Sequence, residues 1–169
     1  WASTPENVNL YVGAIVGVSN STKEFKNLTN SANIEISGKL GYVLYCSGIV
    51  CHAKNGAITN ATNLGNINFT GESAITLRLS GITFICPTLT NCVNGSADAK
   101  QVKGAITVTG KLTGGVRVGA LMPELDALKN TINITDCANY GAFTINCPTT
   151  LSEVQSGGLL GLNSNDART

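Results

Sequence analysis

The stretch Ile34-Glu35-Ile36-Ser37-Gly38 recurs along the chain, and its recurrence is the strongest indication of the fold. It alternates apolar and polar residues and closes on a glycine, a pattern typical of a β-strand with one buried face. Later copies are Ile67-Asn68-Phe69-Thr70-Gly71, Ile106-Thr107-Val108-Thr109-Gly110 and Phe143-Thr144-Ile145-Asn146-Cys147, with a cysteine in place of the last glycine. The chain is therefore expected to consist of repeated strand-forming units.

A second apolar block follows each of these strands at a nearly fixed distance. It begins nine residues after Gly38, Gly71 and Gly110, and ten residues after Cys147. With an earlier copy included, the units begin at Gly13, Ser47, Ser80, Gly119 and Gly157, which are 34, 33, 39 and 38 residues apart. Because the inner step hardly changes while the total varies, we expect the extra length in one loop after this block.

The rest of each unit supplies a turn and a third strand. The turn reads Asx, small, any residue, Asn, at 30–33, 60–63, 91–94 and 136–139. Asn tolerates left-handed turn geometry, and Asn side chains stacked at one position can form an amide ladder. The third strand is expected at 42–45, 75–79 and 116–118, where the alternation returns.

Such a unit cannot bury its apolar face alone, but stacked units can. The sequence therefore predicts an all-β fold, a parallel β-helix or solenoid of about four coils; a β-sandwich with regularly spaced strands is the alternative. Residues 12–169 are expected to form a single repeat domain. Residues 1–11 are expected to be an extended segment that could pair as a strand with a neighbouring subunit. A short helix is expected at 123–129, which begins with a proline and two early acids.

Composition excludes several classes of protein. The 169 residues contain 11 Lys and Arg and 10 Asp and Glu, so the net charge is +1 and no basic patch for nucleic acid is present. No apolar run reaches the roughly 18 residues that a membrane span needs. Asn, Thr and Ser together number 50 residues, so we expect a solvent face of uncharged hydrogen-bonding side chains.

Six cysteines are compatible with three disulfides. They are Cys46, Cys51, Cys86, Cys92, Cys137 and Cys147. In one scheme Cys92 pairs with Cys137, because the two occupy equivalent positions of successive units. In the other, neighbours in sequence pair as Cys46–Cys51, Cys86–Cys92 and Cys137–Cys147, which uses every cysteine but requires a bend at 46–51.

Six N-x-Ser/Thr sequons mark candidate N-glycosylation sites. They are Asn20, Asn27, Asn60, Asn68, Asn94 and Asn133. Together with the even number of cysteines and the low charge, they favour an extracellular or cell-surface glycoprotein carrying N-linked glycans.

The repeat resembles a known family. The sequence Gly-x-apolar-apolar-Gly, followed by an Asn-Cys-x-Asn-x-Gly-x-Ile stretch, resembles the GLUG-type repeat of large bacterial and protist surface proteins. The match runs from about 12 to 161 and is clearest at 13–17, 58–71, 136–143 and 157–161. It departs at Cys51, Phe84 and Pro123, which replace the closing glycine, and at a long insert, 95–104. The resemblance implies a solenoid stalk or adhesin module without a catalytic centre.

The residues themselves offer no catalytic or cofactor-binding set. The acids are scattered: Glu35 has no second acid at the same position of a neighbouring unit, and Glu124 and Asp126 are interpreted as first-turn acids of the short helix. The single histidine, His52, is interpreted as a solvated loop residue, and a zinc site is disfavoured because no Cys-x-x-Cys pair is present. We therefore expect no enzyme, no metal and no cofactor.

These observations predict a structural, non-catalytic extracellular glycoprotein. It is expected to be a protomer or segment of a surface filament, fibril or stalk, associating with itself or with neighbouring repeats of a longer chain. The alternative is an adhesin module that binds carbohydrate or a host surface. No nucleic-acid partner and no membrane span are expected.

Overall fold

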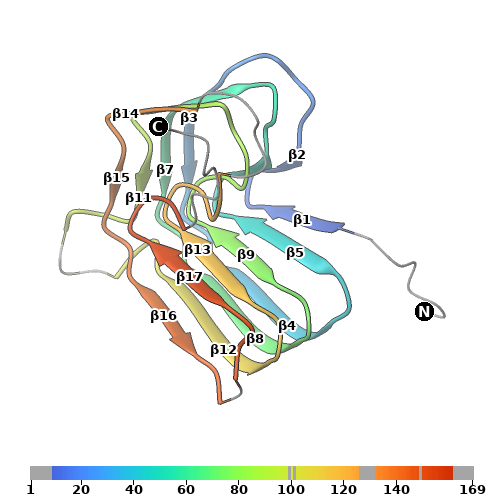
Figure 1. The fold of residues 1–169 in the computed structure, drawn as a ribbon. Helices are drawn as coiled ribbons and strands as arrows, with labels where there is room; N and C mark the ends of the chain where they lie inside the picture. Colours follow the sequence, from blue (N-terminus) through green and yellow to red (C-terminus); the bar gives the residue numbers. More distant parts are fainter. Residues whose placement is uncertain (1–8, 99, 101, 126–131, 149, 162–169) are drawn as a thin grey trace, which may run out of the picture.

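The computed structural model describes residues 9–98, 100, 102–125, 132–148 and 150–161, which wind into a solenoid of short strands (Figure 1). Every strand pair is parallel, and paired residues are one repeat apart in the sequence. The predicted all-β, parallel β-helix fold is therefore confirmed, and the β-sandwich alternative is wrong because a sandwich of that kind is built from antiparallel sheets.

The strands form four sheets that run along the solenoid. Sheet A contains β1 (Asn9–Gly13), β5 (Val43–Ser47), β9 (Leu77–Ser80), β13 (Val116–Gly119) and β17 (Val154–Gly157). Sheet B contains β2 (Val16–Val18) and β6 (Val50–His52). Sheet C contains β3 (Phe25–Asn30), β7 (Ala57–Asn63), β10 (Thr88–Thr90), β11 (Val93–Asn94), β14 (Asn133–Thr135) and β15 (Ala138–Asn139). Sheet D contains β4 (Ile34–Leu40), β8 (Ile67–Ser73), β12 (Ile106–Leu112) and β16 (Phe143–Asn146).

The register follows the two repeated blocks. In sheet D the four copies of the first block lie directly opposite one another, from Ile34 through Ile67 and Ile106 to Phe143. In sheet A the starts of the second block are likewise in register, in the order Gly13, Ser47, Ser80, Gly119 and Gly157. A constant inner step therefore predicted correctly which residues stack.

The closing glycines of the first block allow neighbouring coils to approach closely. A Cβ on Gly71 would lie 2.1 Å from the carbonyl oxygen of Gly38, and Gly38 itself has a φ of +100°. A side chain at Gly71 would therefore displace the backbone of the preceding coil.

The Asn-rich turn forms the predicted amide ladder, with one correction to its register. Asn30 is opposite Asn63, so the first copy is 27–30 and the earlier alignment at 30–33 was wrong by three residues. Along the ladder, Asn30 Nδ2 donates to Asn63 Oδ1, Asn63 Nδ2 to Asn94 Oδ1, and Asn94 Nδ2 to Asn139 Oδ1, each at 2.9 Å. Each Nδ2 also donates to a backbone carbonyl, two residues later in three copies and at Gly104 for Asn94, at 2.9–3.1 Å.

The first Asx of each turn adopts the left-handed conformation. The values of φ are 55°, 54°, 51° and 53° at Asn27, Asn60, Asn91 and Asp136. The three asparagines form a second, exposed ladder, in which Asn91 donates to Asn60 and Asn60 donates to Asn27. The predicted left-handed turn is confirmed at Asn60, Asn91 and Asp136, whereas in the first copy it lies at Asn27 instead of Asn30.

The core is divided into two large lobes, with the buried Asn ladder at their junction, and a small third cluster around Phe84. One lobe fills the space between sheets A and D and includes Leu77 and Phe69. The other lies between sheets B and C and includes Ile49 and Ile58. Gly48 faces the ladder, and a Cβ there would lie 2.4 Å from Cγ of Asn63. The glycine of the second block and the asparagine of the turn are therefore complementary.

Two expected elements differ from the structure. Residues 9–11, assigned to an extended segment, belong to β1 and pair with β5, because this part of the chain already repeats the sheet A pattern; residues 1–8 lie outside the described residues. No helix occurs in the described part of the chain: residues 123–125 form a bend, and 126–129 are outside it.

Candidate functional site

Five of the six predicted sequon asparagines have some exposure, and one has none. Asn20, Asn27, Asn60 and Asn133 are exposed, and Asn68 is half-buried and donates to Glu35. Asn94 is fully buried, and its side-chain amide donates to both Gly104 and Asn139. A glycan cannot be attached to Asn94 in this fold, so the prediction of that site is wrong. The motif alone could not reveal this, because the same residue is the Asn of the ladder.

All six cysteines are free thiols in the structure, so the predicted disulfides are not formed in it. The scheme of sequence neighbours separates two of its couples: Cys46 and Cys51 lie in different core clusters, as do Cys137 and Cys147. The repeat scheme instead places Cys92 and Cys137 side by side, with the Cys92 N–H donating to Cys137 Sγ at 3.3 Å.

The contacts of His52 and Glu124 indicate that both side chains have structural roles. His52 ends β6 rather than lying in a solvated loop, and its ring is edge-on to Tyr11. Burial, reinforced by nearby Lys54, lowers the pKa of His52. Glu124 is buried and accepts from Arg78 and Arg117, so its interpretation as a helix N-terminal acid was wrong. Asp126 lies outside the described residues.

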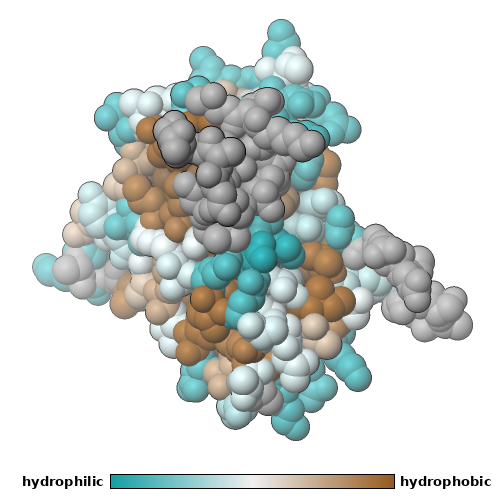
Figure 2. Space-filling view, in the orientation of Figure 1, coloured by the Kyte–Doolittle hydropathy of each residue, from teal (hydrophilic) through white to brown (hydrophobic). Residues whose placement is uncertain are grey.

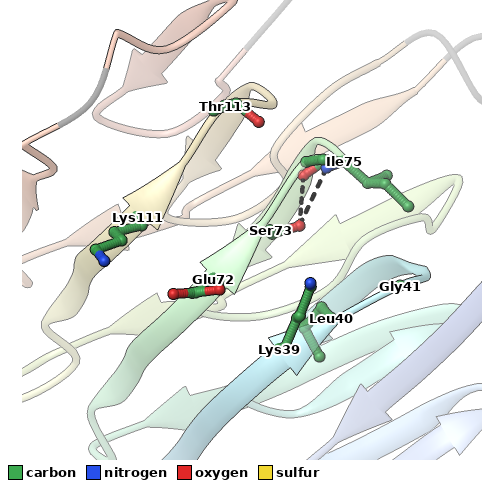
Figure 3. A pocket seen from close by; sticks show the side chains of 9 residues that line it. Lys39, Leu40, Gly41, Glu72, Ser73, Ile75, Lys111 and Thr113 are labelled. Atoms are coloured by element: carbon green, nitrogen blue, oxygen red, sulfur yellow. Dashed lines mark hydrogen bonds between the residues drawn. The ribbon is translucent and has the colours of Figure 1, made fainter.

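A shallow groove with a volume of about 480 Å³ lies over the ends of β4, β8 and β12 (Figure 3). Exposed Lys39 and Lys111 flank exposed Glu72, which is in register with both. The Ser73 hydroxyl donates to the Ile75 carbonyl and accepts the Ile75 N–H, so it is engaged in closing a turn. The groove therefore presents exposed charges of both signs and no nucleophile beside a base.

In the two end coils, side chains at repeat positions that are buried in the middle coils are exposed to solvent. In sheet A one inward column runs Leu10, Leu44, Leu77, Val116 and Val154 in register. Its three middle members are 0% exposed, whereas Leu10 is 40% and Val154 is 53% exposed. Apolar patches also interrupt the polar surface in the part of Figure 2 where Figure 1 draws β15 and β17.

A second column repeats this contrast. It follows the third residue of the second block through Ile15, Ile49, Ile82, Leu121 and Leu159. The middle three are fully buried, while Ile15 and Leu159 are 43% and 40% exposed. Sequence reasoning did not single out these end residues, although aligning the repeats and extending each column to its first and last copy would have found them.

Backbone and side-chain hydrogen-bonding groups are also open at the ends. Within the described residues, β4 pairs only with β8, and β16 pairs only with β12. The ladder residue Asn139 donates to one carbonyl, so its second Nδ2 hydrogen has no partner in that part of the chain. Gln155 Oε1 on β17 is buried and likewise accepts no hydrogen bond there. Each end thus presents both an apolar core section and unused hydrogen-bonding capacity.

Neither a metal-binding cluster nor a long apolar helix occurs in the described residues. Within these ranges no group of three or more His, Cys, Asp or Glu side chains is arranged to hold a metal ion. They also contain no helix whose length and apolar character would suit a bilayer crossing. No protein-family model, curated protein or solved structure matches the chain.

Proposed function

We propose that this protein is a structural, non-catalytic protomer or segment of a filament, in which the N-terminal coil of one copy stacks on the C-terminal coil of the next. The observation that carries the proposal is a difference in burial within the in-register columns: their side chains are buried in the middle coils and partly exposed in the two end coils. Stacking a second copy would bury Leu10 of that copy against Val154, in the way that Leu77 packs against Val116 within one chain.

The hydrogen-bonding groups at the two ends are complementary in the same register. Asn30 of a stacked copy would continue the ladder by accepting from the free Nδ2 hydrogen of Asn139. In sheet A the residue that continues the column after Gln155 is Tyr11 of the next copy. One register therefore continues both the Asn ladder and the sheet A column.

The two joined surfaces are different, so the contact is head-to-tail. A head-to-tail contact generates a ring if the rotation closes and an open filament if it does not. Because successive coils of a solenoid follow one another along an axis, repetition of the contact extends the axis, and a filament is the expected product.

We place this assembly outside the cell, as a glycoprotein. Exposed side chains at Asn20, Asn27, Asn60 and Asn133 support this location, as does a surface dominated by uncharged polar residues. N-linked glycans at these positions would project from a surface whose solubility does not depend on charge.

Two charge variants test the stacking. Leu10→Lys blocks the N-terminal end and Val154→Lys blocks the C-terminal end, and both side chains are already partly exposed, so the fold of the monomer is retained. In sedimentation experiments over a range of concentrations, we expect the wild type to form species that grow with concentration and each variant to remain monomeric. Val102→Lys, at an exposed position that belongs to neither inward column, should behave as the wild type.

Mixing the two variants distinguishes head-to-tail stacking from other contacts. The free tail of Leu10→Lys can accept the free head of Val154→Lys, and both remaining ends are blocked. The mixture should therefore contain a one-to-one dimer that grows no further. A wild type that stays monomeric at every concentration, or a mixture without the dimer, would refute the proposal.

A further inference from the structure

Cys92 and Cys137 lie directly opposite each other on neighbouring coils. Val93 pairs with Ala138, which places the two preceding cysteines in register. Neighbouring strands are about 4.8 Å apart, within the roughly 4.4–6.8 Å that a disulfide accepts between Cα atoms. The Cys92 N–H already donates to Cys137 Sγ at 3.3 Å.

The surroundings give the two thiols different reactivity. Cys137 is half-buried, and the hydrogen bonds from the Cys92 thiol and from backbone N–H lower its pKa, because both stabilise the thiolate. The hydrogen bond to Cys137 and burial raise the pKa of Cys92, which is fully buried. Since the thiolate is the nucleophile, Cys137 is the thiol that can attack an external reagent.

The remaining cysteines lack this arrangement. Burial raises the pKa of Cys46, Cys51 and Cys86, which keeps them protonated inside the core. Burial also raises the pKa of Cys147, although this residue is half-buried like Cys137. Cys147 therefore provides a matched comparison for the reactivity of Cys137.

We propose that Cys92 and Cys137 form a reversible redox pair that closes to a disulfide by exchange with a small-molecule disulfide such as oxidised glutathione. The Cys137 thiolate attacks one sulfur of the reagent, giving a mixed disulfide and releasing one thiol. Cys92 then loses its proton and attacks Cys137 Sγ, closing the protein disulfide and releasing the second thiol. The two protein thiols are oxidised, the reagent is reduced to two thiols, and the inference is independent of filament formation.

Geometry indicates that this bond is easily reduced. Cβ atoms of in-register residues on parallel strands follow the strand spacing of about 4.8 Å, whereas a disulfide prefers about 3.5–4.5 Å. Closing the bond must therefore draw the two coils together, and strained disulfides have higher reduction potentials than structural ones. The bond would also join residues 45 apart, which ties the C-terminal coil to the coil before it.

The test uses the full chain in glutathione buffers of graded oxidised-to-reduced ratio at neutral pH, with peptide mapping by mass spectrometry. We expect a Cys92–Cys137 cross-linked peptide in the oxidising buffers, its loss in the reducing ones, and a melting temperature several degrees higher for the oxidised form. Absence of this peptide at every ratio, or a cross-link from Cys137 to Cys147, would overturn the inference.

Three variants separate the roles of the thiols. Cys92→Ala should stop at the mixed disulfide on Cys137, and it should fold because Ala61 occupies the same position one coil earlier. Cys137→Ala should leave Cys92 unmodified, and Cys147→Ala should oxidise as the wild type does. Circular dichroism checks that each variant is folded. A folded Cys92→Ala variant that forms no mixed disulfide would contradict the assignment of Cys137 as the attacking thiol.

Discussion

Leu77 and Leu10 occupy the same position of the repeat and lie in the same inward column, yet Leu77 is fully buried and Leu10 is partly open to solvent. The only difference between them is the number of coils stacked on either side. Within one inward column of a solenoid, burial is therefore set by the position of the coil along the stack. The same motif forms the core in the middle of the molecule and leaves apolar side chains exposed at its ends.

The largest expected effect comes from truncating the column at these two places. Leu77→Ala should lower the free energy of unfolding by about 4 kcal/mol, because it leaves a cavity between sheets A and D. Leu10→Ala should cost only about 1 kcal/mol, because the side chain is already part-exposed and solvent can fill the space. Urea unfolding at a concentration where the protein is monomeric measures both values.

Val102→Ala serves as the surface control and should change stability by less than about 0.5 kcal/mol. Similar losses at Leu77 and Leu10 would show that the end coil is covered in solution, and would remove the contrast on which the stacking proposal rests.

The Asn ladder gives the next largest contrast. Asn63 accepts from Asn30 and donates to both Asn94 and Gly65, so Asn63→Ala leaves buried polar groups without partners and should cost about 3 kcal/mol. Asn139 lies half-buried at the end of the same ladder, and Asn139→Ala should cost about 1 kcal/mol. Thermal or urea unfolding of the two variants compares them, and a larger loss at the end of the ladder would contradict the account.

The smallest expected contrast concerns the glycine that faces the ladder. A Cβ at Gly48 would lie 2.3 Å from the Gly81 carbonyl oxygen, so Gly48→Ala should cost about 2 kcal/mol by forcing the coils apart. Gly158 holds the same repeat position in the last coil and has no atom within 4 Å of a Cβ placed there, so Gly158→Ala should stay within about 0.5 kcal/mol of the wild type. Unfolding midpoints of the two variants test this, and equal destabilisation would show that backbone strain, rather than crowding, selects glycine.

Much of the fold could be predicted because the distance between repeats in the sequence determines which residues pair on neighbouring coils of a solenoid. The constant step from Gly38 to Ser47 and its later copies placed sheets A and D correctly, since parallel stacking turns equal spacing into contact. The first Asn turn was misaligned by three residues because 27–30 and 30–33 both read Asx to Asn, and only strand pairing separates them.

The candidate sites were less predictable, since they depend on contacts between residues far apart in the sequence. Glu124 was interpreted from the sequence as a first-turn acid of a helix, but packing places it between Arg78 and Arg117 of sheet A. Asn94 matches a glycosylation motif, but the ladder buries it. A motif specifies the order of residue types, but it does not show which of these residues are buried in the folded protein.

The sequence by itself determined the repeated strands, their parallel stacking and the in-register columns, because each follows from local alternation and from the distance between copies. Only the tertiary structure decided the division into two core lobes around the Asn ladder, the contact of Cys92 with Cys137, and the exposure of core positions at both ends. The physical reason is that each coil is stabilised by contacts with its neighbours. Coils of similar sequence therefore differ in burial according to the number of coils stacked on them.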